Sequence, residues 1–149
     1  MSIEDDVALL ERVPTLRLLG REALRNLAFG TEQRDVARGE ALFRAGDTAD
    51  AGFVVQSGSF RVSADDGSAH EVIAGPGSLI GELALIVPMQ RPSTAIALEY
   101  SSTIRISRSL FHRVLEGHPE AARRLRDDVA ARTSQAASDI MLVGAKLTS

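Results

Sequence analysis

The sequence predicts a mainly β fold with flanking helices, on the basis of three observations. Apolar residues recur at helical spacings near both ends of the chain. The middle of the chain, residues 31–107, consists of short alternating segments separated by glycine, which is typical of a sandwich, a jelly roll or a barrel. A length of 149 residues with 44% apolar residues fits one domain over 1–149 with its own core.

A helical lead-in is expected over residues 6–30. Its apolar side chains fall mostly three or four positions apart, on both sides of Pro14. This pattern predicts two short helices. Gly20 and Gly30 are the expected breaks, because glycine commonly follows the last turn of a helix.

Seven strands are expected between residues 31 and 107. They are predicted at 34–36, 41–44, 52–56, 59–63, 70–74, 94–99 and 102–107. The sequence Asp65-Asp66-Gly67 separates the fourth strand from the fifth. It indicates a hairpin, because Asp-Gly supplies the positive φ angles that tight turns between strands require.

Two helices are expected over residues 108–143. Ser107 can cap the first of them and Gly117 can end it. The second begins near Pro119, a residue that is tolerated in a first helical turn. Its apolar residues form a narrow stripe made of Leu125, Val129, Ala136, Ile140 and Val143. The stripe can cover the strands or pair with a second copy of the chain, so a homodimer through this helix is one expectation.

Composition argues against several partners. The net charge of -3 does not suit a surface that neutralises many phosphates, so no nucleic acid is expected to bind directly. Cysteine is absent, which excludes disulfides and thiolate metal sites. The N-terminus is acidic where a signal peptide is basic, and no apolar run approaches the roughly 20 residues of a membrane span. We therefore expect a cytoplasmic protein without a membrane partner.

No arrangement typical of an enzyme is present. His70, His112 and His118 lack the close pairing that metal ligation on a jelly roll requires. No serine, histidine and acid combination stands in a recognisable local context. The three arginines within 123–126 are followed by two aspartates and are expected on a solvated helix face. Neither catalysis nor a cofactor or metal is expected.

The segment 81–95 sets one carboxylate and one guanidinium around a short turn. Arg91 can donate two parallel hydrogen bonds to the oxygens of a phosphate. Glu82 can only accept when it is ionised, and so matches a hydroxyl donor. Alternatively, Glu82 caps the turn and Arg91 neutralises it, as a stabilising ion pair without any ligand.

This segment resembles the phosphate-binding cassette of cyclic nucleotide-binding domains. The segments 39–47 and 52–62 are similar to the second strand and to the third and fourth strands of that family. The resemblance covers roughly residues 13–143. It implies a double-stranded β-helix, or jelly roll, with N-terminal helices and two C-terminal helices. It also implies cyclic AMP or cyclic GMP as the ligand.

The resemblance also implies which residues touch the nucleotide. Glu82 would bind the ribose hydroxyl, Arg91 would bind the phosphate, and backbone amides at the start of the cassette helix would point at the phosphate. The full implied set is Gly81, Glu82, Leu83, Ala84, Arg91 and Ser93. Pro92 departs from the family pattern, because proline lacks the backbone N–H that this position uses on the phosphate. Ser93 is expected to replace that donor, whereas Thr94 is expected to be structural.

Three functions follow as expectations. The first is a regulatory domain that binds cyclic AMP or cyclic GMP and signals through its C-terminal helix to a partner protein, with a slight preference for cyclic AMP. A residue between 129 and 140 would close the pocket over the base. The second is an interaction or dimerisation module that kept the fold without a ligand. The third is a small metal-dependent enzyme on the related cupin jelly roll.

Overall fold

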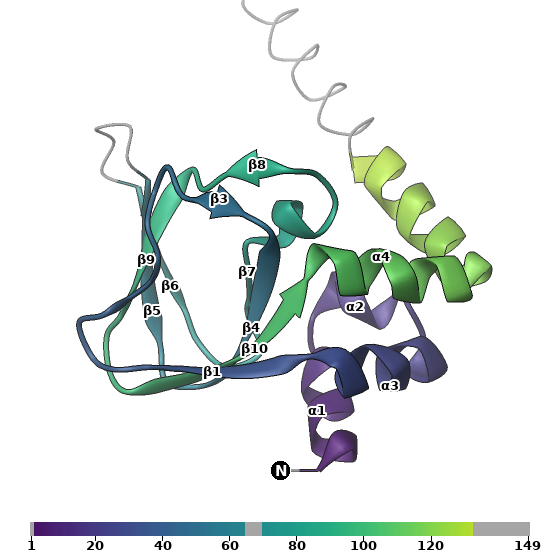
Figure 1. Cartoon of the computed structure of the whole chain (residues 1–149), viewed down its shortest axis with the longest axis horizontal. Coiled ribbons are helices and arrows are strands. Elements are labelled where there is room, and N and C mark those ends of the chain that lie inside the picture. The colour runs from purple at the N-terminus through teal and green to yellow at the C-terminus, as the bar shows by residue number, and fades with distance from the viewer. Residues whose placement is uncertain (1, 65–69, 133–149) are drawn as a thin grey trace, which may run out of the picture.

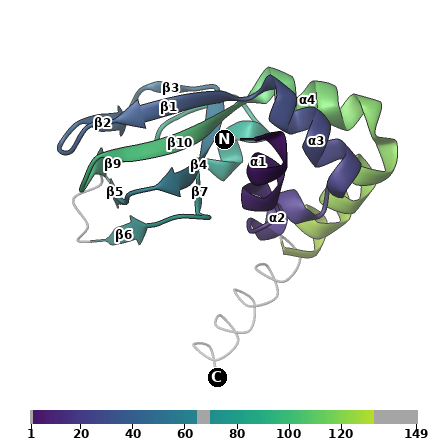
Figure 2. The same ribbon diagram turned by 90° about the horizontal axis from the view of Figure 1, so that it is seen from below.

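The computed structural model describes residues 2–64 and 70–132. Strands form a β-roll on one side of the molecule, and the helices gather against its other end, as both views of the ribbon show (Figures 1 and 2). The helices come from both sides of the strand region in sequence, and those before and after the strands lie together on one side of the roll. The predicted mainly β fold with flanking helices is confirmed.

Three helices precede the roll, one more than the sequence predicts. They are α1 (Ile3–Leu10), α2 (Pro14–Arg17) and α3 (Arg21–Gly30). The first begins before residue 6 because Ser2 caps it, accepting a hydrogen bond from the Asp5 amide in a capping box. The additional break falls at residues 11–13, and Pro14 stands in the first turn of α2, where its missing N–H is not needed. Gly20, with φ of 82°, separates α2 from α3.

The strands form two four-stranded antiparallel sheets and one short pair. The first sheet has the order β1-β10-β4-β7, the second β2-β9-β5-β6, and β3 pairs with β8. Their bounds are β1 (Glu32–Val36), β2 (Ala41–Phe43), β3 (Thr48–Ala49), β4 (Ala51–Ser57), β5 (Phe60–Ala64), β6 (Glu71–Ala74), β7 (Leu79–Ile80), β8 (Met89–Gln90), β9 (Ser93–Ala97) and β10 (Ser101–Ser107). This is the jelly-roll arrangement that the resemblance implies.

Each predicted strand is present to within two residues of its expected bounds. The strands β3, β7 and β8 were not predicted, because two residues are too few to show alternation. The predicted hairpin is supported by its strands, since β5 and β6 pair antiparallel with Val62 opposite Val72. The turn Asp65-Asp66-Gly67 itself lies outside the described residues.

Two apolar cores result. One fills the roll between the two large sheets and includes Phe43, Phe53 and Phe60. The other joins the helices to the outer face of the first sheet, through Val54 and Ile104 among others. The strand β4 is buried on both faces, which explains its continuous apolar sequence. The helices are thus fixed to the back of the sheet that carries β4 and β10.

The C-terminal helices follow β10 directly. Helix α4 (Arg108–Gly117) begins at the Ser107 cap, whose hydroxyl accepts from the Leu110 amide at 3.2 Å, and it ends at Gly117 as predicted. A second helix occupies 119–132 of the described chain. Leu125, the first residue of the predicted stripe, is only 5% exposed and packs into the helical core. Ala136, Ile140 and Val143 lie outside the described residues.

Candidate functional site

A cavity of about 210 Å³ lies where the cassette meets the roll. The cassette links β7, a 3₁₀ turn at Glu82–Leu85 and β8. All six residues that the sequence implicates line this cavity, together with apolar neighbours such as Phe43 and Val62. The fold therefore brings together residues from both ends of the cassette. A larger, mostly apolar hollow of about 770 Å³ between α4 and the helix at 119–132 contains none of the six.

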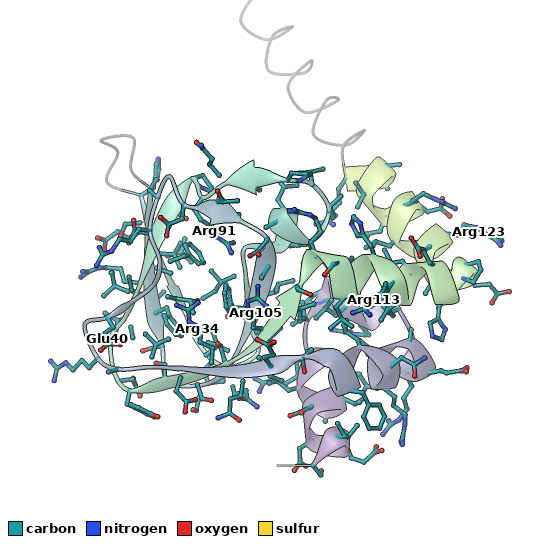
Figure 3. The ribbon with its side chains drawn as sticks, in the orientation of Figure 1. Arg34, Glu40, Arg91, Arg105, Arg113 and Arg123 are labelled. Carbon is teal, nitrogen blue, oxygen red and sulfur yellow. The ribbon has the colours of Figure 1, made fainter. Side chains whose placement is uncertain are left out.

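Arg91 is the most unusual side chain of the cavity. It is only 6% exposed, and Figure 3 shows it inside the roll. Its Nη2 donates to the Ala51 carbonyl at 2.8 Å, and its guanidinium carbon lies 4.2 Å from the centre of the Phe43 ring. Its Nε and Nη1 have no hydrogen-bond partner within the described structure. A buried cation with two unused donors is a ready anion site.

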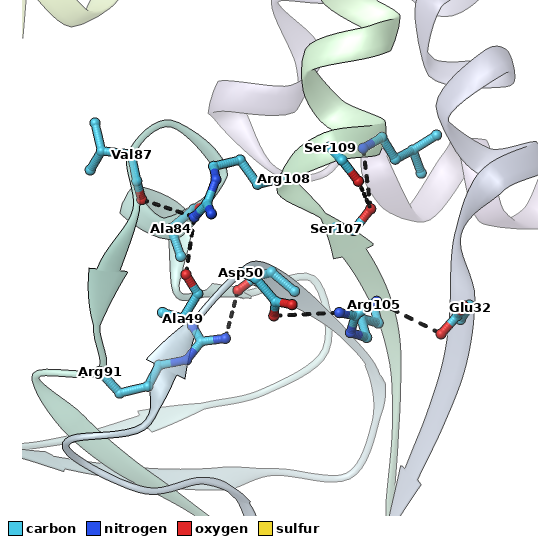
Figure 4. A network of polar contacts seen from close by, with 12 residues as sticks. Glu32, Ala49, Asp50, Ala84, Val87, Arg91, Arg105, Ser107, Arg108 and Ser109 are labelled. Atoms are coloured by element: carbon cyan, nitrogen blue, oxygen red, sulfur yellow. Dashed lines mark hydrogen bonds and ion pairs between the residues drawn. The ribbon is translucent and has the colours of Figure 1, made fainter.

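The surroundings of Arg91 do not neutralise it. Burial is the main cause that lowers the pKa of Arg91 from its ordinary value, and Asp50 and Asp47 partly oppose that shift. The Asp50 carboxylate is engaged elsewhere, since it accepts from Arg105 at 3.4 Å (Figure 4). Glu82 forms no ion pair with Arg91 among the described residues. The ion pair between Glu82 and Arg91, which was the alternative to a ligand, is therefore not formed here.

Gly81 allows the guanidinium to lie where it does. Its φ is 80°, in the left-handed region that favours glycine. A Cβ at this position would lie 2.6 Å from Nη1 of Arg91. The backbone conformation thus favours glycine here, and any larger residue would also displace the Arg91 guanidinium from this position.

Glu82 is held by two residues that the sequence did not point to. Its Oε1 accepts a short hydrogen bond from the Thr15 hydroxyl on α2. The same oxygen lies 3.4 Å from Nη2 of Arg132, at the end of the helix over 119–132. Arg132 also pairs with Asp128 one turn earlier, at 3.0 Å. Only this i,i+4 pair could have been expected from the sequence, because the partners of Glu82 are 67 and 50 residues away.

The remaining cassette residues differ in what they offer. Leu83 is 55% exposed, whereas Ala84 is buried and its amide already donates to the Gly81 carbonyl at 3.2 Å. Ser93 lines the cavity next to Arg91 at the start of β9. The Thr94 hydroxyl accepts from the Ala45 amide at 2.9 Å, which is the structural role expected for it. The amide of Ala84 is therefore less available to an anion than the Arg91 side chain.

Across 2–64 and 70–132, no group of three or more histidine, aspartate or glutamate side chains is placed to hold a metal ion. Among the helices of this part of the chain, none combines the length and the apolar character that crossing a membrane requires.

Comparison with known proteins identifies relatives. The model of the cyclic nucleotide-binding domain family matches residues 33–118. The chain is 30% identical over 125 residues to the HTH-type transcriptional regulator Cmr of Mycobacterium tuberculosis, and 33% identical over 134 residues to an uncharacterized NTE family protein of the same species. The crystal structure of the N-terminal domain of a transcriptional regulator from Streptomyces coelicolor superposes with a TM-score of 0.77 at 30% identity.

Coverage differs among these relatives. The match with the Streptomyces domain spans 86% of this chain and 94% of that domain. The two mycobacterial matches span 83% and 85% of this chain but only 51% of Cmr and 23% of the NTE family protein. What is shared is therefore one domain of longer proteins. The chain belongs to the cyclic nucleotide-binding domain family.

Proposed function

We propose that this chain is a regulatory domain that binds cyclic AMP or cyclic GMP with Arg91 on the cyclic phosphate. One observation carries the proposal: Arg91 is buried, and two of its nitrogens have no partner within the described residues. An unpaired buried charge is unfavourable by several kcal/mol. A singly charged phosphate in the cavity supplies the missing acceptors and the opposite charge.

The rest of the cavity supports a nucleotide as the source of that phosphate. Glu82 places a carboxylate at the cavity wall, where it can accept a hydrogen bond from the ribose 2'-hydroxyl. Phe43 and Val62 offer apolar contacts. Ser93 lies beside Arg91 and can contribute the donor that Pro92 lacks. Each charge-assisted hydrogen bond contributes about 1.5 to 3 kcal/mol. We favour cyclic AMP slightly over cyclic GMP.

Signalling through the C-terminal helix is the second part of the proposal. Arg132 on that helix touches Glu82, so a ribose hydroxyl that engages Glu82 competes with this contact. Occupancy of the cavity then changes the equilibrium position of the helix, which is what a switch requires. The receiver of the signal is a partner protein or another part of a longer chain, as in the transcriptional regulators to which this chain is similar.

Isothermal titration tests the proposal. Wild-type protein is titrated with cyclic AMP and with cyclic GMP, and the same titrations are repeated with Arg91→Met. We expect saturable binding of at least one nucleotide to the wild type and at least tenfold weaker binding to the variant. No heat with either nucleotide up to millimolar concentration would refute the proposal.

A ligandless interaction or dimerisation module is the alternative, and two observations favour it. Pro92 removes one donor from the phosphate site. The Glu82 carboxylate already has two partners within the chain, Thr15 and Arg132. This alternative predicts that Arg91→Met changes neither the binding of a partner protein nor the oligomeric state measured by sedimentation. A charged substitution such as Val129→Glu should disrupt both. The sensor predicts that partner capture depends on nucleotide and on Arg91.

A further inference from the structure

We propose that Arg108 is a positioning residue that fastens the cassette to the first turn of α4. The inference rests on the proposed function, because it names the route by which a ligand at Arg91 acts on α4. Arg108 is the first residue of α4 and follows β10 directly. It does not line the cavity, although one of its partners, Ala84, does. Its role would be to hold other groups in place.

The contacts of Arg108 join three separate segments. Its Nη1 donates to the carbonyl of Ala49 at 3.0 Å, to that of Ala84 at 3.3 Å and to that of Val87 at 3.2 Å (Figure 4). Ala84 and Val87 belong to the turn and loop of the cassette, and Ala49 ends β3. One guanidinium group thus bonds backbone carbonyls of the cassette and of β3. All three contacts are made by Nη1, so its two N–H groups are shared among three carbonyls.

Arg108 and Arg91 also bond neighbouring carbonyls of one three-residue segment, 49–51. The carbonyl of Ala49 accepts from the Arg108 side chain, and the carbonyl of Asp50 accepts from the Arg108 amide at 2.8 Å. The next carbonyl, that of Ala51, accepts from Nη2 of Arg91 at 2.8 Å. Three successive carbonyls therefore connect the anion-binding side chain to the start of α4. If Arg91 moves toward an anion, its bond to Ala51 is strained or lost. That change acts on the segment 49–51, to which Arg108 is bonded through its side chain and through its amide.

The ion pair between the cassette and the helix over 119–132 is a weaker link. The Glu82–Arg132 pair has side chains that are 36% and 51% exposed, and such exposed ion pairs contribute little. The contacts of Arg108 with Ala49 and Ala84 are partly buried, where water competes less for the same donors. We expect the larger share of the coupling between the cavity and the helices to pass through Arg108.

Hydrogen exchange on the ligand-free protein gives the first test. The amides of Ile86 and Val87 both donate to the Leu83 carbonyl, so their exchange reports whether the turn is held. In Arg108→Gln their exchange should rise about tenfold, because three donor contacts are lost. Arg108→Lys, which keeps the charge but not the fork, should restore only part of the protection. Arg113→Gln, which removes an exposed arginine from the same helix, is the control and should change nothing.

Exchange with a nucleotide present gives the second test. In the wild type, cyclic AMP or cyclic GMP should change the hydrogen-exchange rates of the α4 amides. In Arg108→Gln the nucleotide should still bind through Arg91, but the exchange rates of the α4 amides should stay the same. Equal exchange of Ile86 and Val87 in wild type and Arg108→Gln would overturn the inference. So would an undiminished response of α4 in that variant. If the wild type binds no nucleotide, the proposed function fails, while the ligand-free comparison still decides the role of Arg108.

Discussion

Gly81 and Arg91 lie so close together that a Cβ on Gly81 would stand 2.6 Å from Nη1 of Arg91. Gly81 is the first residue of the cassette, and Arg91 lies ten positions later in the chain. Their approach leaves the guanidinium stacked on Phe43 with two nitrogens unbonded inside the described structure. The position of the charge thus depends on the absence of a side chain opposite it.

The first prediction concerns that approach. Gly81→Ala should lower the free energy of unfolding by about 1 to 3 kcal/mol, because an alanine is strained at a φ of 80°. It should also weaken nucleotide binding at least tenfold, since the guanidinium must move away. Gly75→Ala is the control, because a Cβ there meets nothing within 4 Å. Denaturant unfolding and calorimetry measure both effects, and equal affinities for the two variants would contradict the geometry.

The second prediction separates stability from binding at Arg91. Arg91→Met should leave the free energy of unfolding of the ligand-free protein unchanged or raise it by about 1 kcal/mol, because an apolar side chain replaces an unpaired buried charge. The increase in stability that saturating nucleotide gives the wild type should vanish. Arg61→Met on β5, whose arginine is half-exposed, is the control. A loss of more than about 2 kcal/mol in the absence of nucleotide would show that the guanidinium is a stabilising group.

The third prediction tests whether Glu82 accepts from the ribose. Glu82→Gln should weaken binding of the cyclic nucleotide about tenfold or more, because one charge-assisted hydrogen bond is lost. The same variant should bind the 2'-deoxy analogue nearly as well as the wild type does. Competition titrations with the two ligands measure the four affinities. If the variant weakens both ligands equally, Glu82 acts through Thr15 or Arg132 and not through the hydroxyl.

The fourth prediction concerns the helix that carries Arg132. Leu125→Ala should lower the free energy of unfolding by about 2 to 5 kcal/mol, because this leucine is 5% exposed within the helical core. The loss should not depend on protein concentration, since the contacts are within one chain. Val72→Ala on β6 is the control, because Val72 is 64% exposed. A concentration-dependent effect at Leu125 would indicate instead that the stripe joins two chains.

Features that depend on neighbours in sequence were predictable. Ser107 caps α4 and Gly117 ends it, because each acts on backbone groups within one helical turn. The seven longer strands follow from alternation along each segment. The number of N-terminal helices was wrong, because the break between α1 and α2 falls at residues 11–13, just before Pro14, where no glycine marks it.

The sequence by itself determined the class of fold, the family and the identity of the cassette residues, because these are written in local pattern and spacing. Only the tertiary structure decided that Arg91 is buried with two nitrogens unbonded among the described residues, and that Arg108 and Arg91 hold neighbouring carbonyls. Contacts of this kind join residues tens of positions apart. They depend on how the sheets pack around the cassette, and local sequence patterns do not predict that packing.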